Sequence, residues 1–390
     1  LFPYTTLFRS YFKLNEEVFL VTGNRAAIYN VLNKSIFLLS DEEEKIISDF
    51  ELGGLVDTEY KKNIANEIKK LGLGNYYNTN IYIEKINTMP KWYEYLFFKP
   101  APIINRITIQ LEDCQYYCEN CDVKRYRRYC NCFVNEITNN RKRLDYDKYR
   151  NLIDQIKLLD VREVLFTGSG YNNRFNAKEE LIEKCIEVGI KNIKYIQCYK
   201  DLHNINYIKL SNIGAFMILQ TDNNIDIDLL KQLKNLNIKF MLLIILKFKE
   251  EKIHRKSELE DLKIKYNIDY VFNVEEDKNE IMDLYNGEIN GVGLEAFSQN
   301  LKYNRCLNGN IAVNNSGIIS PCLGLKEESV GNINSFFDIF KNNKLSKYWE
   351  LSIDKIDKCK DCGLRYACFD CRSLEIKLGA SLFGKISCMR

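Results

Sequence analysis

The feature that most constrains the fold of this chain is a regular alternation of apolar and helix-forming segments between residues 107 and 274. Mostly apolar runs alternate there with charged stretches in which apolar residues recur at helical spacing. Apolar strands separated by helices are typical of parallel sheets built from βα units. Six runs predict six such units and a partial (βα)6 TIM-like barrel; they are Ile107–Leu111, Glu163–Thr167, Ile193–Gln197, Ala215–Gln220, Lys239–Leu246 and Tyr270–Val274.

A cluster of prolines marks a boundary before this alternation. Pro90, Pro100 and Pro102 lie close together, and each fixes φ and removes a backbone donor. We therefore expect a linker at residues 86–103. It separates a module at 11–85 from the barrel at 104–290. The alternation of apolar and helix-forming segments ends there, and a cysteine-rich domain is expected at 291–390.

The segment before the linker is expected to form a winged-helix-like α+β module. Apolar runs at 11–14, 18–22 and 26–32 predict three short strands. Ser40 and Glu43 have the spacing of a helix capping box. A second amphipathic helix is expected over Thr58–Leu71, ending at Gly72.

The first ten residues are interpreted as an artefact. LFPYTTLFRS can be encoded without a break by a common short-read sequencing adapter, and the chain has no initiator Met. We exclude residues 1–10 from the fold and expect the natural chain to begin a little before Tyr11.

Composition limits the class of protein. The net charge is only +3, which indicates no nucleic-acid partner, and we interpret the local basic run at 124–143 as a solvated helix face. The longest apolar run, Phe240–Leu246, is too short to span a bilayer, so no membrane partner is expected. With only two histidines among 390 residues, Ser-His-Asp catalysis and Cys2His2 zinc sites are disfavoured.

The chain contains 14 cysteines, most of them in tight spacings. A secreted disulfide framework is one interpretation, but such frameworks belong mostly to small domains without a core. The spacings favour metal ligation in a reducing cytoplasm. Cys185 and Cys198 stand apart from the clusters and are expected to be buried core thiols.

A first cysteine set, Cys114, Cys118 and Cys121, follows directly on the first predicted barrel strand. Three thiolates can hold three corners of an iron–sulfur cube and leave one iron free for a small molecule. A structural zinc site, with Cys130 or Cys132 as its fourth ligand, or a redox thiol cluster is the alternative.

This spacing, at the end of the first strand of a six-unit barrel, resembles the radical S-adenosylmethionine (SAM) superfamily. The resemblance implies that the triplet binds a [4Fe–4S] cluster and that SAM binds its free iron. It also implies reductive cleavage of SAM to a 5′-deoxyadenosyl radical, which abstracts hydrogen from the substrate. SAM binding would involve Gly168, Ser169 and Gly170, although the family usually has Gly-Gly-Glu there and an aromatic residue in place of Asn120.

The C-terminal cysteines form a more specific pattern that resembles the SPASM domain of radical SAM peptide-modifying enzymes. Its accessory segments include 317–322, 331–333 and 365–368. The resemblance implies two auxiliary [4Fe–4S] clusters, with a pair of zinc knuckles as the alternative. One would be ligated by Cys359, Cys362, Cys368 and Cys388, and the other, with an open position, by Cys306, Cys322 and Cys371.

The N-terminal module resembles the precursor-recognition domain of peptide-maturing enzymes. Such modules add an extended leader peptide as a strand to a sheet edge. The candidate surface is the edge near Ala26–Leu32 together with the helix Thr58–Leu71. A fold-stabilising cap is the alternative.

Together, these resemblances imply an oxidoreductase-type maturase of a ribosomally made precursor peptide with leader and core. The reaction would be hydrogen abstraction followed by oxidative cross-linking through a thioether or carbon–carbon bond. One SAM-binding and two auxiliary [4Fe–4S] clusters, SAM and a flavodoxin- or ferredoxin-type reductant are implied. No catalytic side chain stands out from the sequence. One alternative is a degenerate relative that binds peptide and passes electrons without cleaving SAM, and another is a zinc protein.

Overall fold

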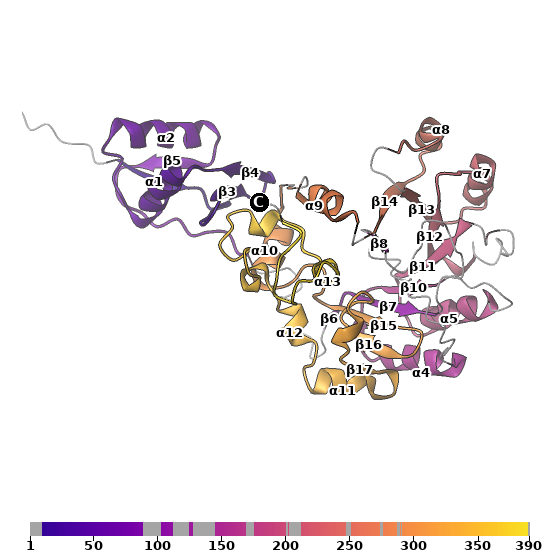
Figure 1. Ribbon diagram of the computed structural model, residues 1–390. Helices are drawn as coiled ribbons and strands as arrows, with labels where there is room; N and C mark the ends of the chain where they lie inside the picture. Colours follow the sequence, from indigo (N-terminus) through magenta and orange to yellow (C-terminus); the bar gives the residue numbers. More distant parts are fainter. Residues whose placement is uncertain are drawn as a thin grey trace, which may run out of the picture.

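The computed structural model describes residues 10–88, 103–111, 125–127, 145–168, 175–199, 202, 212–246, 251–273, 276–286, 289 and 291–388. An N-terminal α/β lobe stands at one end of the molecule and a large sheet at the other (Figure 1). The cysteine-rich C-terminal region lies between them. Within the described ranges, no helix is long and apolar enough to cross a membrane.

The large sheet is built around six parallel strands that follow one another in chain order, so the predicted βα alternation is confirmed. Helices between these strands cover the sheet, with a core that contains Leu152, Ile182 and Leu230. The strands are β7 (Arg106–Gln110), β10 (Val164–Thr167), β11 (Ile193–Cys198), β12 (Phe216–Thr221), β13 (Phe240–Leu246) and β14 (Tyr266–Asn273). The helices are α4 (Tyr146–Ile156), α5 (Phe175–Glu187), α7 (Ile227–Asn235) and α8 (Lys256–Asp261).

Two features of the sheet differ from expectation. Strand β14 begins at Tyr266 rather than Tyr270, because its first half carries Asn267 and the fully buried Asp269, which interrupt the apolar pattern. The basic run is not simply a helix face, because Arg125–Arg127 forms strand β8, antiparallel to β14.

The C-terminal region extends the same sheet on its other side. Strand β15 (Asn310–Val313) pairs in parallel with β7, so the first barrel strand is not an edge. Strands β16 (Ile318–Ser320) and β17 (Gly331–Asn332) continue the sheet in antiparallel fashion. The remaining elements are β6 (Ile103–Ile104), β9 (Asp160–Val161), α9 (Lys278–Asn286), α10 (Leu294–Lys302), η2 (Lys326–Glu328), η3 (Ile333–Ser335), α11 (Phe336–Lys341), α12 (Ser346–Trp349), η4 (Ile353–Lys355), η5 (Arg365–Ala367) and α13 (Arg372–Lys377).

The N-terminal lobe contains the three predicted strands and two predicted helices. The capping box is confirmed: Ser40 Oγ accepts from the Glu43 backbone N–H at 3.3 Å, and Glu43 Oε2 accepts from the Ser40 N–H at 2.7 Å. Two further strands were not expected, because each is a short run with little apolar alternation. The elements are β1 (Tyr11–Leu14), β2 (Val18–Val21), β3 (Ala27–Asn30), β4 (Ser35–Leu38), α1 (Asp41–Leu52), α2 (Glu59–Lys70) and β5 (Gly74–Tyr77).

The prediction of a free sheet edge near Ala26–Leu32 is wrong. Strand β3 pairs with β2 on one side and with the unpredicted β4 on the other, so its backbone groups are already bonded. The outer strands of this three-stranded sheet are β2 and β4. An added strand would therefore have to pair with one of these two.

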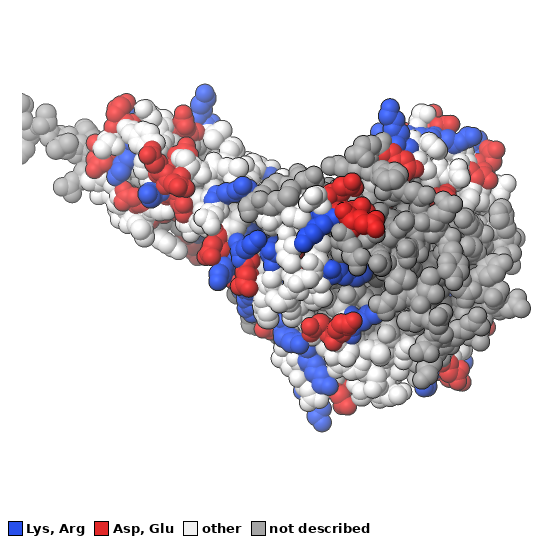
Figure 2. Space-filling model, in the orientation of Figure 1, with Lys and Arg blue, Asp and Glu red and all other residues white. Residues whose placement is uncertain are grey.

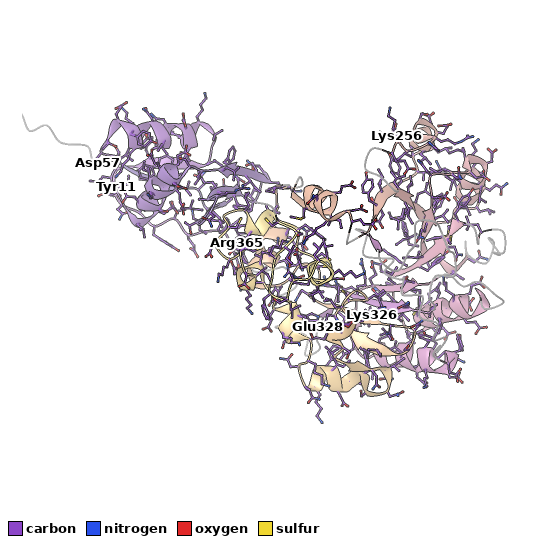
Figure 3. The ribbon with its side chains drawn as sticks, in the orientation of Figure 1. Tyr11, Asp57, Lys256, Lys326, Glu328 and Arg365 are labelled. Atoms are coloured by element: carbon purple, nitrogen blue, oxygen red, sulfur yellow. The ribbon has the colours of Figure 1, made fainter. Side chains whose placement is uncertain are left out.

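The N-terminal lobe and the C-terminal region share a hydrophobic core. Val21, Ala27 and Tyr29 of the lobe pack in one cluster with Phe297 and Tyr366. The Tyr29 and Phe297 rings lie 5.3 Å apart between centroids. The lobe is thus packed against the cysteine-rich region. Arg365, labelled in Figure 3, marks this junction.

Candidate cluster-binding sites

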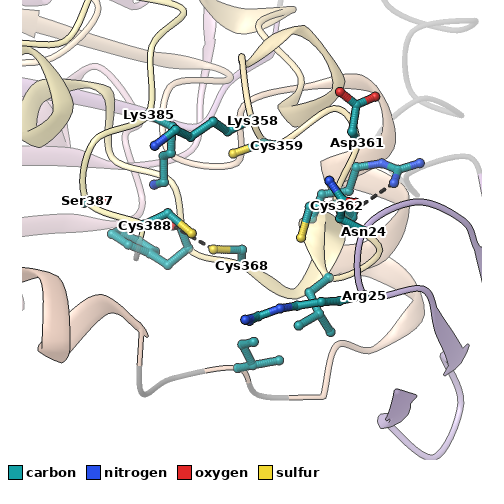
Figure 4. Close-up of a pocket in the computed structure, with 14 residues that line it drawn as sticks. Asn24, Arg25, Lys358, Cys359, Asp361, Cys362, Cys368, Lys385, Ser387 and Cys388 are labelled. Carbon is teal, nitrogen blue, oxygen red and sulfur yellow. Dashed lines mark hydrogen bonds between the residues drawn. The ribbon is translucent and has the colours of Figure 1, made fainter. Parts of the chain in front are cut away.

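Four C-terminal cysteines surround one cavity. Cys359, Cys362, Cys368 and Cys388 line a space of about 320 Å³, within the roughly 300–1,000 Å³ typical of ligand sites. Their sulfur atoms face this space from several sides (Figure 4). They are the four residues that the resemblance to the SPASM domain assigns to one auxiliary cluster.

Tight turns hold the first three of these thiols. Cys362 N–H donates to the Cys359 carbonyl at 3.0 Å, so the two thiols lie on one turn. The short helix η5 follows, and Cys368 stands directly after it. The Cys359 turn begins after Lys358, whose φ of 61° is left-handed. The Cys-x2-Cys spacing therefore produces a compact loop with both sulfurs on the cavity side.

A buried ion network holds the segment that carries the fourth thiol. Lys385 Nζ lies 2.8 Å from Glu375 Oε1 and 3.4 Å from Asp370 Oδ1. Arg372, whose side chain is fully buried, pairs with Asp370 and donates to the Gly384 carbonyl at 2.7 Å. These contacts fix residues 382–387 and hence the position of Cys388 beside them.

Two of the thiols in this cavity, those of Cys359 and Cys368, are harder to ionise than ordinary cysteines. Burial raises the pKa of Cys359 to about 12, with the charge of Lys385 acting in the opposite direction. Burial also raises the pKa of Cys368. A bound metal ion, or the cationic iron–sulfide core of a cluster, would offset this penalty, because it stabilises thiolates directly. The site is therefore suited to ligation rather than to a free nucleophilic thiolate.

The other three C-terminal cysteines form a second group. Burial raises the pKa of Cys322 well above its ordinary value, and the nearby thiolates of Cys306 and Cys371 add to the rise. Backbone bonds position all three: Cys306 N–H donates to Asn304 Oδ1 at 3.0 Å, the Cys322 carbonyl accepts from Leu325 N–H at 3.0 Å, and the Cys371 carbonyl accepts from Glu375 N–H at 3.1 Å. These three thiols therefore lie near one another, apart from the four that line the cavity.

The donor set of the four-cysteine cavity fits an iron–sulfur cluster. A cubane distributes its thiolate ligands over four iron atoms, and the four sulfurs here surround a space instead of meeting at a point. Within the described ranges, no three His, Cys, Asp or Glu side chains are placed to hold a metal ion. All described cysteines are free thiols, so that part of the chain has no disulfide framework. Cys185 and Cys198 are buried, as predicted.

The N-terminal cysteine triplet lies outside the described residues, as do Cys130, Cys132, Ser169 and Gly170. Gly168 is described: it follows β10 with φ of 99°, a conformation that favours glycine. Its carbonyl accepts from Lys178 Nζ at 3.0 Å, and Lys178 also donates to the Ile196 carbonyl at 3.0 Å. Lys178 is 3% exposed. This buried lysine, which sequence reasoning missed, ties the ends of β10 and β11 together.

Polar side chains gather at the carboxyl ends of the parallel strands. Leu165, Ile196 and Ile218 form an apolar layer on one face of the sheet together with Leu243. Two residues further along three strands, the same face carries Thr167, Cys198 and Gln220, and Gln110 pairs with Thr167 in register. Thr167 Oγ1 is buried without a hydrogen-bond partner in the described part of the chain. Parallel α/β folds place ligand sites at this edge.

These features define the class of fold. The chain has the fold of radical SAM/SPASM peptide maturases, as its motifs predict. The structure of Streptococcus suis SuiB bound to S-adenosylmethionine aligns with 97% of this chain and 100% of SuiB, with 14% identity and a TM-score of 0.50. SuiB bound to precursor peptide SuiA aligns over the same shares, with 15% identity and a TM-score of 0.51.

A third structure, native anSMEcpe with bound AdoMet, aligns with 73% of this chain and 93% of that chain, with 15% identity and a TM-score of 0.48. No protein-family model and no curated protein matches the sequence.

Proposed function

We propose that this protein is a radical SAM maturase that modifies a ribosomally made precursor peptide by hydrogen abstraction and oxidative cross-linking. The bond formed would be a thioether or a carbon–carbon bond. One observation carries the proposal: the four cysteines of the SPASM-like pattern surround a single cavity in a chain that has the SuiB fold. The proposed domains are a recognition module at 11–85, a linker at 86–103, the radical SAM barrel at 104–290 and the SPASM domain at 291–390.

The proposed SAM site lies at the carboxyl ends of β7 and β10. Cys114, Cys118 and Cys121 follow β7 in sequence and would hold the SAM-binding cluster, with Gly168, Ser169 and Gly170 against SAM. When bound, SAM and this cluster supply a radical that abstracts hydrogen. Lys178 holds the Gly168 carbonyl in place. The Thr167 hydroxyl, which has no hydrogen-bond partner among the described residues, offers a polar group at the same edge.

The C-terminal cysteines would hold two auxiliary clusters. Four thiolates, those of Cys359, Cys362, Cys368 and Cys388, would ligate one cluster fully, which suits electron transfer. The group of three would leave one iron of the other cluster open. Cross-linking removes two electrons and two hydrogens from the peptide, so one electron must leave through such a centre. A flavodoxin- or ferredoxin-type reductant and a reducing, oxygen-free compartment are part of the proposal.

The N-terminal module would bind the leader peptide by strand addition. Strand β4 is an outer strand of its sheet, and Leu38 at its end is 61% exposed. Unpaired backbone groups on an outer strand can accept an extended peptide. One of the SuiB structures contains a precursor peptide, which supports a peptide as the partner.

Anaerobic reconstitution followed by SAM and dithionite tests this function. Three cubane clusters bring roughly twelve irons per chain, and the proposal requires 5′-deoxyadenosine to form. Colourless protein with stoichiometric zinc would instead establish the zinc alternative.

A second candidate is a relative that binds peptide and passes electrons without cleaving SAM. The absence of an acid from Gly168-Ser169-Gly170 favours it. Full iron loading without 5′-deoxyadenosine would contradict the maturase and leave this candidate standing.

A further inference from the structure

The N-terminal module forms one wall of the four-cysteine cavity. The turn between β2 and β3 reaches the cysteine loop, and Asn24 and Arg25 line the cavity beside the thiols. Figure 4 shows the Arg25 side chain extending alongside Cys362 and Cys368, next to the space into which the sulfurs face. The environment of this site is therefore completed by a residue more than 330 positions away in the sequence.

Two glycines make this close approach possible. A Cβ on Gly23, whose φ is 120°, would lie 2.5 Å from the Asp361 carbonyl oxygen. A Cβ on Gly363 would lie 2.2 Å from the Arg25 carbonyl oxygen. Real Cβ atoms do not approach oxygen so closely, so each segment has a glycine where the other one presses against it.

Backbone hydrogen bonds then fix the turn on the cysteine loop. Asn24 N–H donates to the Asp361 carbonyl at 2.6 Å, and Gly363 N–H donates to the Asn24 carbonyl at 2.8 Å. Arg365 Nη1 donates to the Thr22 carbonyl at 3.0 Å. These bonds on both sides of Cys362 hold the Arg25 backbone in position relative to the thiols.

Within the described residues, no carboxylate pairs with the charge of Arg25. Lys385, which also lines the cavity, is compensated by Asp370 and Glu375, and Arg365 is paired with Asp354 at 2.8 Å. In the described part of the chain, neither Arg25 nor the lining residue Lys358 forms an ion pair with a carboxylate. Among the residues that line the cavity, Asp361 is acidic, and it points its carboxylate away from the cavity (Figure 4).

We propose that Arg25 tunes the auxiliary cluster held by Cys359, Cys362, Cys368 and Cys388, and raises its reduction potential. The inference rests on the proposed function, because it requires that cluster. A cluster with four thiolates is anionic, and reduction adds a further negative charge. Its potential depends on nearby charge, hydrogen bonds and solvent exposure. Arg25 is exposed, but the backbone contacts of its turn keep its guanidinium at the cavity. A positive charge there stabilises the reduced state more than the oxidised state.

The test isolates one cluster in the full-length chain. In the parent protein, alanine replaces the cysteines of the other two sets: Cys114, Cys118, Cys121, Cys306, Cys322 and Cys371. Anaerobic reconstitution should then give about four irons per chain. The midpoint potential is measured by redox titration with electron paramagnetic resonance for the parent, Arg25→Gln, Arg25→Lys and Lys360→Gln. Lys360 is exposed in the same cysteine loop but does not line the cavity.

The expected result is a shift to a more negative potential in Arg25→Gln, recovery of most of that shift in Arg25→Lys, and a far smaller change in Lys360→Gln. Equal potentials in the parent and Arg25→Gln would overturn the inference and leave the proposed cluster intact. A parent that binds no iron would contradict the cluster itself, and this inference with it. Another outcome is that Arg25→Gln loads no cluster at all. In that case, cluster loading by Arg25→Lys would support a role for a positive charge at this position, and failure of both variants to load would overturn the inference.

Discussion

The hydroxyl of Tyr29, in strand β3, donates a hydrogen bond of 2.8 Å to the carbonyl oxygen of Gly363 in the cysteine loop. Tyr29 is fully buried, and burial, with the nearby Cys362 thiolate, raises the pKa of its hydroxyl well above the ordinary value. The hydroxyl therefore remains a donor at any physiological pH. Because Gly363 follows Cys362 directly, this bond joins the N-terminal core to the four-cysteine cavity.

Replacing Tyr29 with Phe should destabilise this junction. The substitution keeps the ring contact with Phe297 but leaves the buried Gly363 carbonyl without its donor, which costs about 1–3 kcal/mol. The shift in the urea unfolding midpoint measures the cost. Tyr60→Phe is the control, since the Tyr60 hydroxyl bonds to Glu42 at the surface and its removal should have much less effect. Equal shifts in the two variants would contradict a structural role for the Tyr29 bond.

Gly23→Ala should separate the N-terminal turn from the cysteine loop. The new Cβ would meet the Asp361 carbonyl oxygen at 2.5 Å, in addition to the strain of a φ of 120°. Gly72→Ala is a matched control, because Gly72 also has a positive φ, of 72°, but has open space around its Cβ position. Left-handed backbone alone costs roughly 1–2 kcal/mol.

Hydrogen exchange of the Asn24 and Gly363 amides reports on the contact directly. Faster exchange in Gly23→Ala than in Gly72→Ala is expected. Unchanged protection of both amides in Gly23→Ala would show that the turn and the loop do not depend on this close approach.

The sequence located a strand with a continuous apolar run more closely than strands whose apolar pattern is interrupted or exposed. Strand β13 is apolar throughout and was located to within one residue, whereas β14 contains the buried Asp269, and β4 is a four-residue outer strand. The division of the C-terminal cysteines into two groups came from the resemblance to the SPASM domain. Arg25 was not predicted, because its place at the cavity depends on a turn packing against a loop far along the chain. Lys and Arg are interspersed with Asp and Glu over the face of the molecule seen in Figure 2, so charge alone does not single out any one cation.

Removing ligands from one C-terminal cysteine group should remove the iron of one cluster and leave the others. Replacing Cys359 and Cys362 with Ala removes half of one proposed ligand set, so iron should fall from roughly twelve to about eight per chain. Cys185→Ala is the control, because Cys185 is a core thiol on α5 that lies outside both groups. Iron analysis after anaerobic reconstitution, with visible absorption, measures the change. Retention of about twelve irons in the double variant would contradict the ligand assignment.

Glu375 should make the C-terminal region sensitive to acid. Burial on its own raises the pKa of this carboxyl, but the charge of Lys385 and the hydrogen bonds from Lys385, Ser387 and the Ile386 N–H outweigh it. The pKa therefore lies below its ordinary value of 4.5. A carboxyl whose pKa is lowered by folding stabilises the native state fully above its unfolded pKa. That stabilisation is lost as the pH falls through the lower, folded-state value.

Urea unfolding midpoints at pH 7, 5 and 4 and below test this dependence. Glu375→Gln leaves Lys385 with Asp370 alone, and breaking a buried ion pair costs about 3–5 kcal/mol, so the variant should be much less stable at pH 7. It should also lose the part of the acid sensitivity that appears below pH 4.5, because it has no carboxyl to protonate. Glu67→Gln, on the exposed face of α2, should keep the native profile. The contrary result is that Glu375→Gln and the native chain lose stability in parallel below pH 4.5. That result would show that protonation of the Glu375 carboxyl does not drive the acid sensitivity of this region.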